Sequence, residues 1–380
     1  MPGPLSGIRI VEFAGIGPGP FAAMLLADHG AEVVRIERPG ARRGLVPLDR
    51  SRTSIAVDCK SPQGVEVVRA LCRTADGIVE GYRPGVMERL GLGPGVLIDD
   101  NPRLVYGRMT GWGQDGPLAQ AAGHDINYIA IAGVLHGIGE TGRGPVPPLN
   151  YLGDFGGGAM FLAFGMLAAL LHARASGEGQ VVDAAMTDGA AYLASMTWAF
   201  RGQGLWRDER GANILDGGAH FYGCYACADG EFLAVGAIEP QFQQAFLQVL
   251  GLAEDPAFAN ALDARQWAAC KARVGGVVAT RTRDEWVAAF AGLDACVSPI
   301  LSMGEALAHP HNVARRTFRT IDGKPVPAPA PRFSASVADA ARPPVAVGAD
   351  TARVLGALGY DDDRIAGLAM RGVIATNEPR

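Results

Sequence analysis

The chain has 380 residues, of which 48% are hydrophobic and 19% charged, and its formal net charge is −5. This length suits two or three domains, or one large α/β domain with an insertion, and the composition excludes intrinsic disorder. The acidic balance argues against a general nucleic-acid binder, although it is compatible with a local basic pocket.

The first half of the chain alternates predicted strands and helices. Strand patterns occupy residues 8–13, 31–36, 54–57, 77–80, 104–109 and 180–183. Helical patterns occupy residues 21–29, 63–74 and 159–173, and Gly156-Gly157-Gly158 opens the last of them. Such alternation is typical of a doubly wound, mostly parallel sheet, so we expect a Rossmann-like α/β fold.

The second half changes character. One long apolar helix is predicted over residues 183–207, followed by a β-hairpin over 221–226 and 231–237. Helices over 239–251, 256–278 and 282–292 lead to a strand at 296–300, a loop from His309-Pro310 and a proline-rich crossing at 325–331. We therefore expect a large domain (1–185), a linker helix (186–215), a small α+β domain (216–312) and a segment (313–380) that returns to the large domain.

Compartment and metal content follow from the cysteines and the apolar runs. The six cysteines, at positions 59, 72, 224, 227, 270 and 296, are too scattered for a secreted disulfide scaffold. Cys224 and Cys227 form a C-x-x-C pair, but no second pair or histidine set completes a zinc site, so we expect no metal. No signal-peptide pattern is present, and the apolar run 159–171 is shorter than the roughly 18 residues of a membrane span. We expect a cytoplasmic protein.

Glycines follow the first predicted strand, at positions 15, 17 and 19. A dinucleotide fingerprint would need glycine or alanine at position 20, where this chain has Pro20. Glu37, at the end of the second strand, could hold a ribose, but its neighbours Arg35 and Arg38 favour a phosphate. We therefore expect a Rossmann-like unit that binds something other than NAD.

Basic side chains recur just beyond predicted strands, at Arg38, Lys60, Arg83 and Arg89. In open α/β sheets, ligands bind beyond the carboxyl ends of the strands. Arginine there suits a polyphosphate ligand, and the alternative is a set of unrelated solvated side chains.

Three further side chains could carry acid–base chemistry. His124 lies beside Asp125, but neighbours in sequence do not face each other on a helix, so they need not form a dyad. Asp154 precedes a glycine-rich helix start and Glu239 follows a strand, and either could be only a helix cap.

Seven segments, in this order, resemble one known family: GPLSGIRIVEFAGIGPGP, EGYRPGVMERLGLGP, RMTGWGQDGP, GHDINY, GDFGGG, GQVVDAAMTDG and VGAIEPQF. The chain is similar over nearly its whole length, to about residue 335, to the family III CoA-transferase superfamily, and more narrowly to its 2-methylacyl-CoA racemase branch. The resemblance implies a Rossmann-like large domain and a small domain in an interlocked homodimer, with the active site between subunits.

The same resemblance implies roles for individual residues. His124 and Asp154 match the two acid/base residues of the branch, and Glu239 matches the glutamate that pairs with the histidine. The positions matching CoA contacts are Arg38, Val57, Asp58, Cys59, Lys60, Gly81, Tyr82, Arg83, Arg89, Gly123, Asp125, Ile126, Asn127 and Tyr128. No cofactor is implied, because CoA is part of the substrate, and neither a nucleic-acid nor a membrane partner is expected.

The implied chemistry is racemisation or epimerisation of a 2-methylacyl-CoA thioester through an enolate, which requires one proton-transfer group on each face of the carbon. Backbone N–H groups near Asp125 or Asp154 are the expected donors to the enolate oxygen. The alternative is a CoA-transferase, in which Asp154 is a nucleophile. Transferases carry a glycine run in an active-site flap, whereas residues 214–220 have only Gly217 and Gly218.

Overall fold

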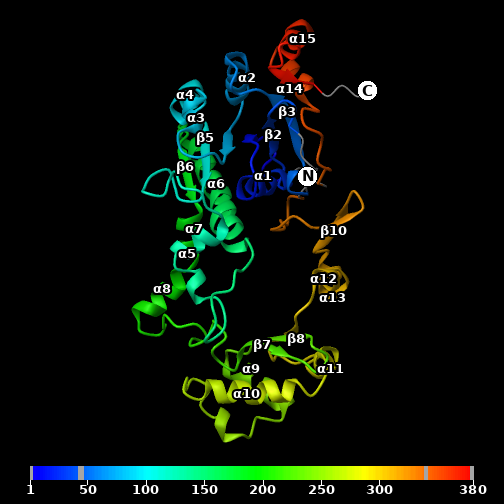
Figure 1. The fold of residues 1–380 in the computed structure, drawn as a ribbon. Coiled ribbons are helices and arrows are strands. Elements are labelled where there is room, and N and C mark those ends of the chain that lie inside the picture. Colours follow the sequence, from blue (N-terminus) through cyan, green and yellow to red (C-terminus); the bar gives the residue numbers. More distant parts are fainter. Residues whose placement is uncertain (1–2, 42–46, 338–340, 377–380) are drawn as a thin grey trace. The chain divides into compact units, whose positions relative to one another are not determined.

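The computed structural model describes residues 3–41, 47–337 and 341–376. The chain divides into two compact units (Figure 1). Unit 1 contains residues 1–132, 149–193 and 316–380, and unit 2 contains residues 133–148 and 194–315. Residues 133–148, predicted as part of the large domain, therefore group with unit 2, and residues 186–193, predicted as part of the linker helix, group with unit 1.

Unit 1 is built on a central sheet. In the described residues, this sheet has seven strands in the order β12-β3-β2-β1-β4-β5-β6. The strands are β1 (Arg9–Phe13), β2 (Glu32–Glu37), β3 (Arg52–Val57), β4 (Gly77–Glu80), β5 (Val105–Thr110), β6 (Val181–Ala185) and β12 (Ile374–Ala375). All pairings are parallel except that of β12 with β3. The order 3-2-1-4-5-6 is that of a doubly wound Rossmann-like sheet, so the predicted α/β class is confirmed.

Helices cover both faces of this sheet. One apolar core contains buried residues of α2 (Pro62–Cys72), α4 (Pro94–Asp100), α14 (Thr351–Ala357) and α15 (Asp362–Met370). The other contains residues of α1 (Pro18–Asp28) and α6 (Met160–Ser176). The remaining elements of unit 1 are η1 (Pro47–Asp49), α3 (Val86–Arg89), α5 (Asp125–Ile131), the π-helical η3 (Tyr151–Ala159), α7 (Met186–Leu193), β10 (Phe318–Ile321) and β11 (Lys324–Pro327).

Unit 2 has its own core around a small antiparallel sheet. Its strands are β7 (Tyr222–Ala226), β8 (Phe232–Gly236) and β9 (Val297–Pro299), in the order β7-β8-β9. The other elements are η2 (Leu135–Gly137), α8 (Ser195–Gly202), α9 (Pro240–Leu250), η4 (Pro256–Phe258), α10 (Trp267–Val278), α11 (Arg283–Ala289), α12 (Met303–Ala308) and α13 (Pro310–Arg315).

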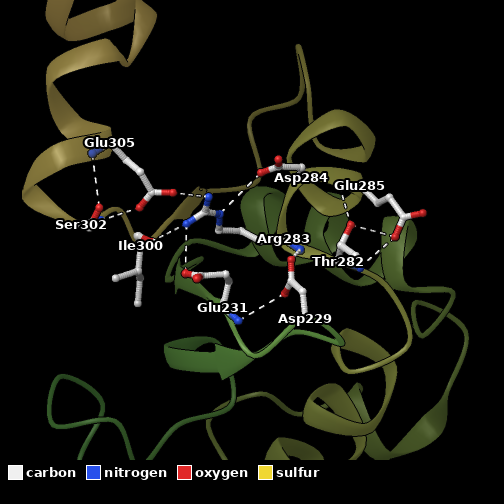
Figure 2. A network of polar contacts seen from close by, with 9 residues as sticks. All are labelled: Asp229, Glu231, Thr282, Arg283, Asp284, Glu285, Ile300, Ser302 and Glu305. Carbon is white, nitrogen blue, oxygen red and sulfur yellow. Dashed lines mark hydrogen bonds and ion pairs between the residues drawn. The ribbon is translucent and has the colours of Figure 1, made fainter.

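Arg283 joins three elements of unit 2 (Figure 2). It begins α11, and its guanidinium donates to Glu231 before β8 at 3.1 Å, to the Ile300 carbonyl after β9 at 3.2 Å and to Glu305 of α12 at 2.6 Å. Because this side chain is largely buried, the three contacts fix the hairpin, α11 and α12 relative to one another.

Several predicted boundaries were wrong. The predicted helix 183–207 is β6 to Ala185, then α7 and α8, because residues 181–185 pair with β5. Helical structure begins at Tyr151 rather than after the glycines, and α1 begins at Pro18 rather than Phe21. The predicted loop from His309 contains α13, and part of the proline-rich crossing forms β11, which pairs with β10.

The continuous helix Tyr151–Ser176 is long and apolar enough to cross a membrane by length and composition. Buried helices of soluble proteins pass the same test, and Leu162, Met166 and Leu170 of this helix pack in a core of unit 1. The apolar run predicted from the sequence, residues 159–171, is shorter than this helix, because η3 extends the helix back to Tyr151.

Candidate active site

A pocket of about 870 Å³ lies in unit 1, beyond the carboxyl ends of β1, β4 and β5. Its walls come from the turn after β1, the loop after β4, the end of β5, the segment before α5 and the start of η3. The strand order reverses between β1 and β4, so the pocket occupies the position where open α/β sheets bind their ligands.

His124 lies in this pocket, directly before α5. Its backbone N–H donates to Asn127 Oδ1 at 3.0 Å, and the Asn127 N–H donates back to the His124 carbonyl at 2.8 Å. The imidazole is exposed. This reciprocal cap fixes the His124 backbone. It does not engage the imidazole ring, and His124 is one of the residues that line the pocket.

Asp154 lies in the same pocket, on η3. Asn150 Nδ2 donates to its Oδ2 at 3.1 Å, and a Cβ at Gly17 would lie 3.3 Å from the same oxygen. Burial and the nearby Asp125 charge raise the pKa of Asp154, whereas the hydrogen bond from Asn150 and the charge of His124 oppose the rise. His124 and Asp154 are thus brought together in one pocket and are electrostatically coupled.

Asp125 is buried, and its side chain contacts the start of η3. Its Oδ2 accepts the N–H groups of Gly153 at 2.6 Å and of Asp154 at 2.7 Å, which satisfies two donors that η3 leaves unpaired at its start. The Asp154 N–H is therefore engaged by Asp125, and the expectation that N–H groups near Asp125 or Asp154 serve an enolate oxygen stays a prediction. A role for the N–H of Asp125 itself stays a prediction.

Five other predicted contacts also line the pocket: Gly81, Tyr82, Arg83, Gly123 and Asn127. Tyr128 lines it as well, with its ring buried edge-on to Trp112 and its hydroxyl donating to the Gly123 carbonyl. The close approach of the Tyr128 ring leaves no room for a Cβ at Gly123 or Gly111.

The remaining predicted CoA contacts lie outside the pocket walls. Arg38 is exposed directly after β2, Val57 is the buried last residue of β3, and Ile126 is exposed on α5. Beyond β3, Asp58 Oδ1 accepts the Lys60 N–H at 3.0 Å, and burial raises the pKa of the Cys59 thiol to about 11. Arg38 and residues 57–60 follow strands of the same parallel sheet, at its carboxyl edge, so these contacts stay predictions.

Glu239 belongs to unit 2, where it is exposed and directly precedes α9. Its carbonyl accepts the Phe242 and Gln243 N–H groups, both at 3.0 Å. Its pairing with His124 stays a prediction.

Arg35 and Glu37 do not serve a ligand phosphate or ribose. The Arg35 guanidinium is 2% exposed and pairs with Asp49 and with Glu12 at 3.4 Å. Glu37 is buried and accepts the Ser54 hydroxyl at 2.5 Å. The interpretation that Arg35 favours a phosphate was wrong, because its charge is neutralised inside the protein.

Sequence reasoning missed several residues that line the pocket, among them Asn150 and Glu80. Asn150 lies four residues before Asp154, a spacing that places two side chains on one helix face and could have indicated the contact. Glu80 ends an apolar strand, and no sequence signal links it to its partner Arg108 of β5. Within residues 3–41, 47–337 and 341–376, no group of three His, Cys, Asp or Glu side chains is arranged to hold a metal ion.

The chain matches the model of CoA-transferase family III over residues 5–351. It is 48% identical to the α-methylacyl-CoA racemase of Mus musculus over 365 residues, which cover 95% of each chain. It is 44% identical to the Homo sapiens enzyme of the same name over 377 residues, or 98% of each chain. The human succinyl-CoA:glutarate CoA-transferase is 30% identical, over 99% of this chain and 91% of that protein.

Solved structures agree in fold. A CAIB/BAIF family protein from Brucella suis superposes with a TM-score of 0.82 at 25% identity, covering 94% of this chain and all of the other. Rv3272 from M. tuberculosis gives 0.77 at 27% identity, covering 92% and 99%.

Proposed function

The chain belongs to CoA-transferase family III, and we propose that it is an isomerase that racemises or epimerises 2-methylacyl-CoA thioesters. The observation that carries this proposal is one pocket that holds both His124 and Asp154, in a chain 44–48% identical to two racemases. The substrate class comes from the names of those relatives, and the pair of acid–base groups suits the reaction.

Inversion at C2 requires that a proton leaves one face and another arrives on the opposite face. In one direction, neutral His124 removes the α-proton while protonated Asp154 delivers its proton to the other face of the enolate. The reverse direction starts from ionised Asp154 and protonated His124. Each turnover thus removes one proton from C2 and delivers one proton to C2, and these two transfers call for no metal or redox cofactor.

The environment of Asp154 supports its acid role. Burial and Asp125 raise the pKa of its carboxyl group, so the protonated form persists to higher pH than for a solvated aspartate. Glu239 is proposed to orient the His124 imidazole and stabilise its cationic form. The Asp125 N–H is proposed to donate to the enolate oxygen.

The predicted CoA contacts are proposed to bind the substrate along the carboxyl edge of the sheet. Arg83 in the pocket wall, and Arg38, Lys60 and Arg89 beyond the strands, would supply positive charge for its phosphates.

We also propose an interlocked homodimer whose active site lies between subunits. The support is an apolar stripe on one face of α6, formed by the exposed side chains of Met160, Phe164, Leu167 and Leu171. A contiguous exposed apolar surface is typical of a protein–protein interface. A second copy of this chain is the proposed occupant.

A CoA-transferase is the second candidate, favoured by the 30% identity to succinyl-CoA:glutarate CoA-transferase. Asp154 would then attack the thioester as a nucleophile, which requires its ionised form. The raised pKa of Asp154 favours the proton-transfer role instead.

Incubation of one pure epimer with the protein, followed by chiral separation, distinguishes the two candidates. Racemisation predicts an epimer mixture without an added acceptor, and Asp154→Asn should slow it by about 10²-fold or more. CoA transfer to an added free acid, with the epimer unchanged, would assign the transferase function instead.

A further inference from the structure

Arg108 on β5 lies between two carboxylates and has no part in the proposed proton transfers. Its Nε donates to Glu80 Oε1 of β4 at 3.0 Å, and its two terminal nitrogens donate to the carboxylate of Glu88 at 2.8 and 3.3 Å. The Arg108 side chain is 7% exposed, Glu80 is 1% exposed and Glu88 is 44% exposed. We call these three residues the Arg108 triad.

The Arg108 triad holds both ends of one segment at the pocket rim. At the first end, Glu80 Oε2 accepts the Tyr82 N–H at 2.7 Å and so fixes the loop directly after β4. At the other end, Glu88 anchors α3, whose Met87 is fully buried. The guanidinium of Arg108 bridges the two ends, so the path of residues 81–89 depends on it.

That segment carries two arginines whose charge is available. Arg83 and Arg89 are exposed, and in the part of the chain that the structure describes, neither forms an ion pair. The Arg89 guanidinium lies close to the turn at Gly85: its Nη1 is 3.1 Å from the position that a Cβ on Gly85 would occupy. Two uncompensated guanidinium groups on one braced segment are suited to a ligand with several phosphates.

We propose that Arg108 is a positioning residue for the phosphate-bearing end of CoA: through Glu80 and Glu88 it holds the segment that presents Arg83 and Arg89. The inference rests on the proposed function, because it takes the ligand to be a CoA thioester. It assigns Arg108 no contact with the reacting carbon. The effect of its removal should therefore depend on the nucleotide part of the substrate and not on the acyl part.

The test compares two substrates with the same 2-methylacyl group, one on CoA and one on pantetheine, which lacks the nucleotide and its phosphates. The variants are Arg108→Gln and Glu88→Gln. The KM of the CoA thioester should rise about tenfold, with kcat changed less than about threefold and with kcat/KM of the pantetheine thioester unchanged. A purely structural brace would instead lower the kcat/KM of both substrates equally, and that result would overturn the proposal.

Further variants keep the result interpretable. Glu66→Gln removes an exposed ion pair with Arg364 on the same unit and should leave KM and kcat of both thioesters unchanged. Glu88 is partly exposed, so Glu88→Gln should fold even if Arg108→Gln does not, and an unchanged KM in a folded Glu88→Gln would also contradict the proposal. Since Glu88 acts through the segment that carries Arg83 and Arg89, Glu88→Gln should raise KM little further in a protein that already carries both Arg83→Ala and Arg89→Ala.

Binding of free CoA, measured by calorimetry, separates this inference from the proposed function. If the wild type binds CoA more tightly than Glu88→Gln does but does not racemise the substrate, the proposed function is wrong and the inference about Arg108 stands. Racemisation with equal CoA affinity in the wild type and Glu88→Gln would overturn only the inference, and no CoA binding at all would overturn both.

Discussion

At the scale of single residues, the protonation of Asp154 is set by groups that the structure identifies. Burial and the Asp125 charge raise its pKa, and the hydrogen bond from Asn150 counteracts them. Because each direction of the proposed reaction uses a different protonation state of Asp154, the balance of these groups determines the pH range in which both directions run.

Asn150→Ala tests this balance. Asn150 donates to the carboxylate and stabilises its ionised form, so its removal should raise the pKa of Asp154 further. The limb of the pH profile of kcat/KM that reports Asp154 should move upward by up to about one pH unit. Asn312→Ala, which removes an amide bonded to a backbone carbonyl of unit 2, should leave the limb in place. A downward shift in Asn150→Ala would show that this contact does not favour the carboxylate.

At the scale of elements, unit 2 contains a buried histidine that the proposed reaction does not use. His220, just before β7, packs edge-on to Phe221 and Phe258, with both ring centroids 5.2 Å away. Burial lowers its pKa to about 4. The folded state therefore binds this proton less readily than the unfolded state. The stability that neutral His220 contributes is present above about pH 6.5 and is lost as the pH falls toward 4.

His220→Phe keeps the aromatic contacts and removes the titration. Between pH 7 and pH 4, the free energy of unfolding should fall by roughly 3 kcal/mol less in this variant than in the wild type. Chemical denaturation at several pH values measures the difference, and His311→Gln, on an exposed helix, is the control. Parallel pH curves for the wild type and His220→Phe would contradict the assignment.

An element could be predicted from the sequence where neighbouring residues define it, and not where contacts with distant segments define it. Strand β4 matches its predicted range, because an apolar run between polar turns defines it locally. The helix predicted over 183–207 was wrong, because the pairing of residues 181–185 with β5 is a long-range interaction that periodicity does not contain. Likewise, the motif resemblance indicated His124 and Asp154, whereas Asp125 as a cap of η3 and the Arg108 triad depend on segments that meet only in the fold.

At the scale of the whole molecule, the apolar stripe on α6 is the surface that the proposed homodimer is expected to cover. Phe164→Asp places a charge at its centre, where the side chain is 72% exposed in the single chain. Sedimentation should show a shift from dimer to monomer, with loss of activity if the active site needs the partner. Met370→Asp, on another exposed surface, should leave the mass unchanged. A Phe164→Asp protein that sediments like the wild type would exclude this stripe as the interface.

The most direct test of the proposed reaction uses one pure epimer of a 2-methylacyl-CoA in deuterated buffer, with deuterium at C2 and the epimer ratio followed together. The proposed reaction predicts that deuterium enters C2 as the single epimer converts to a mixture, and that His124→Ala, while still folded, loses most of this conversion. No deuterium uptake by the wild type, or full activity in His124→Ala, would contradict it.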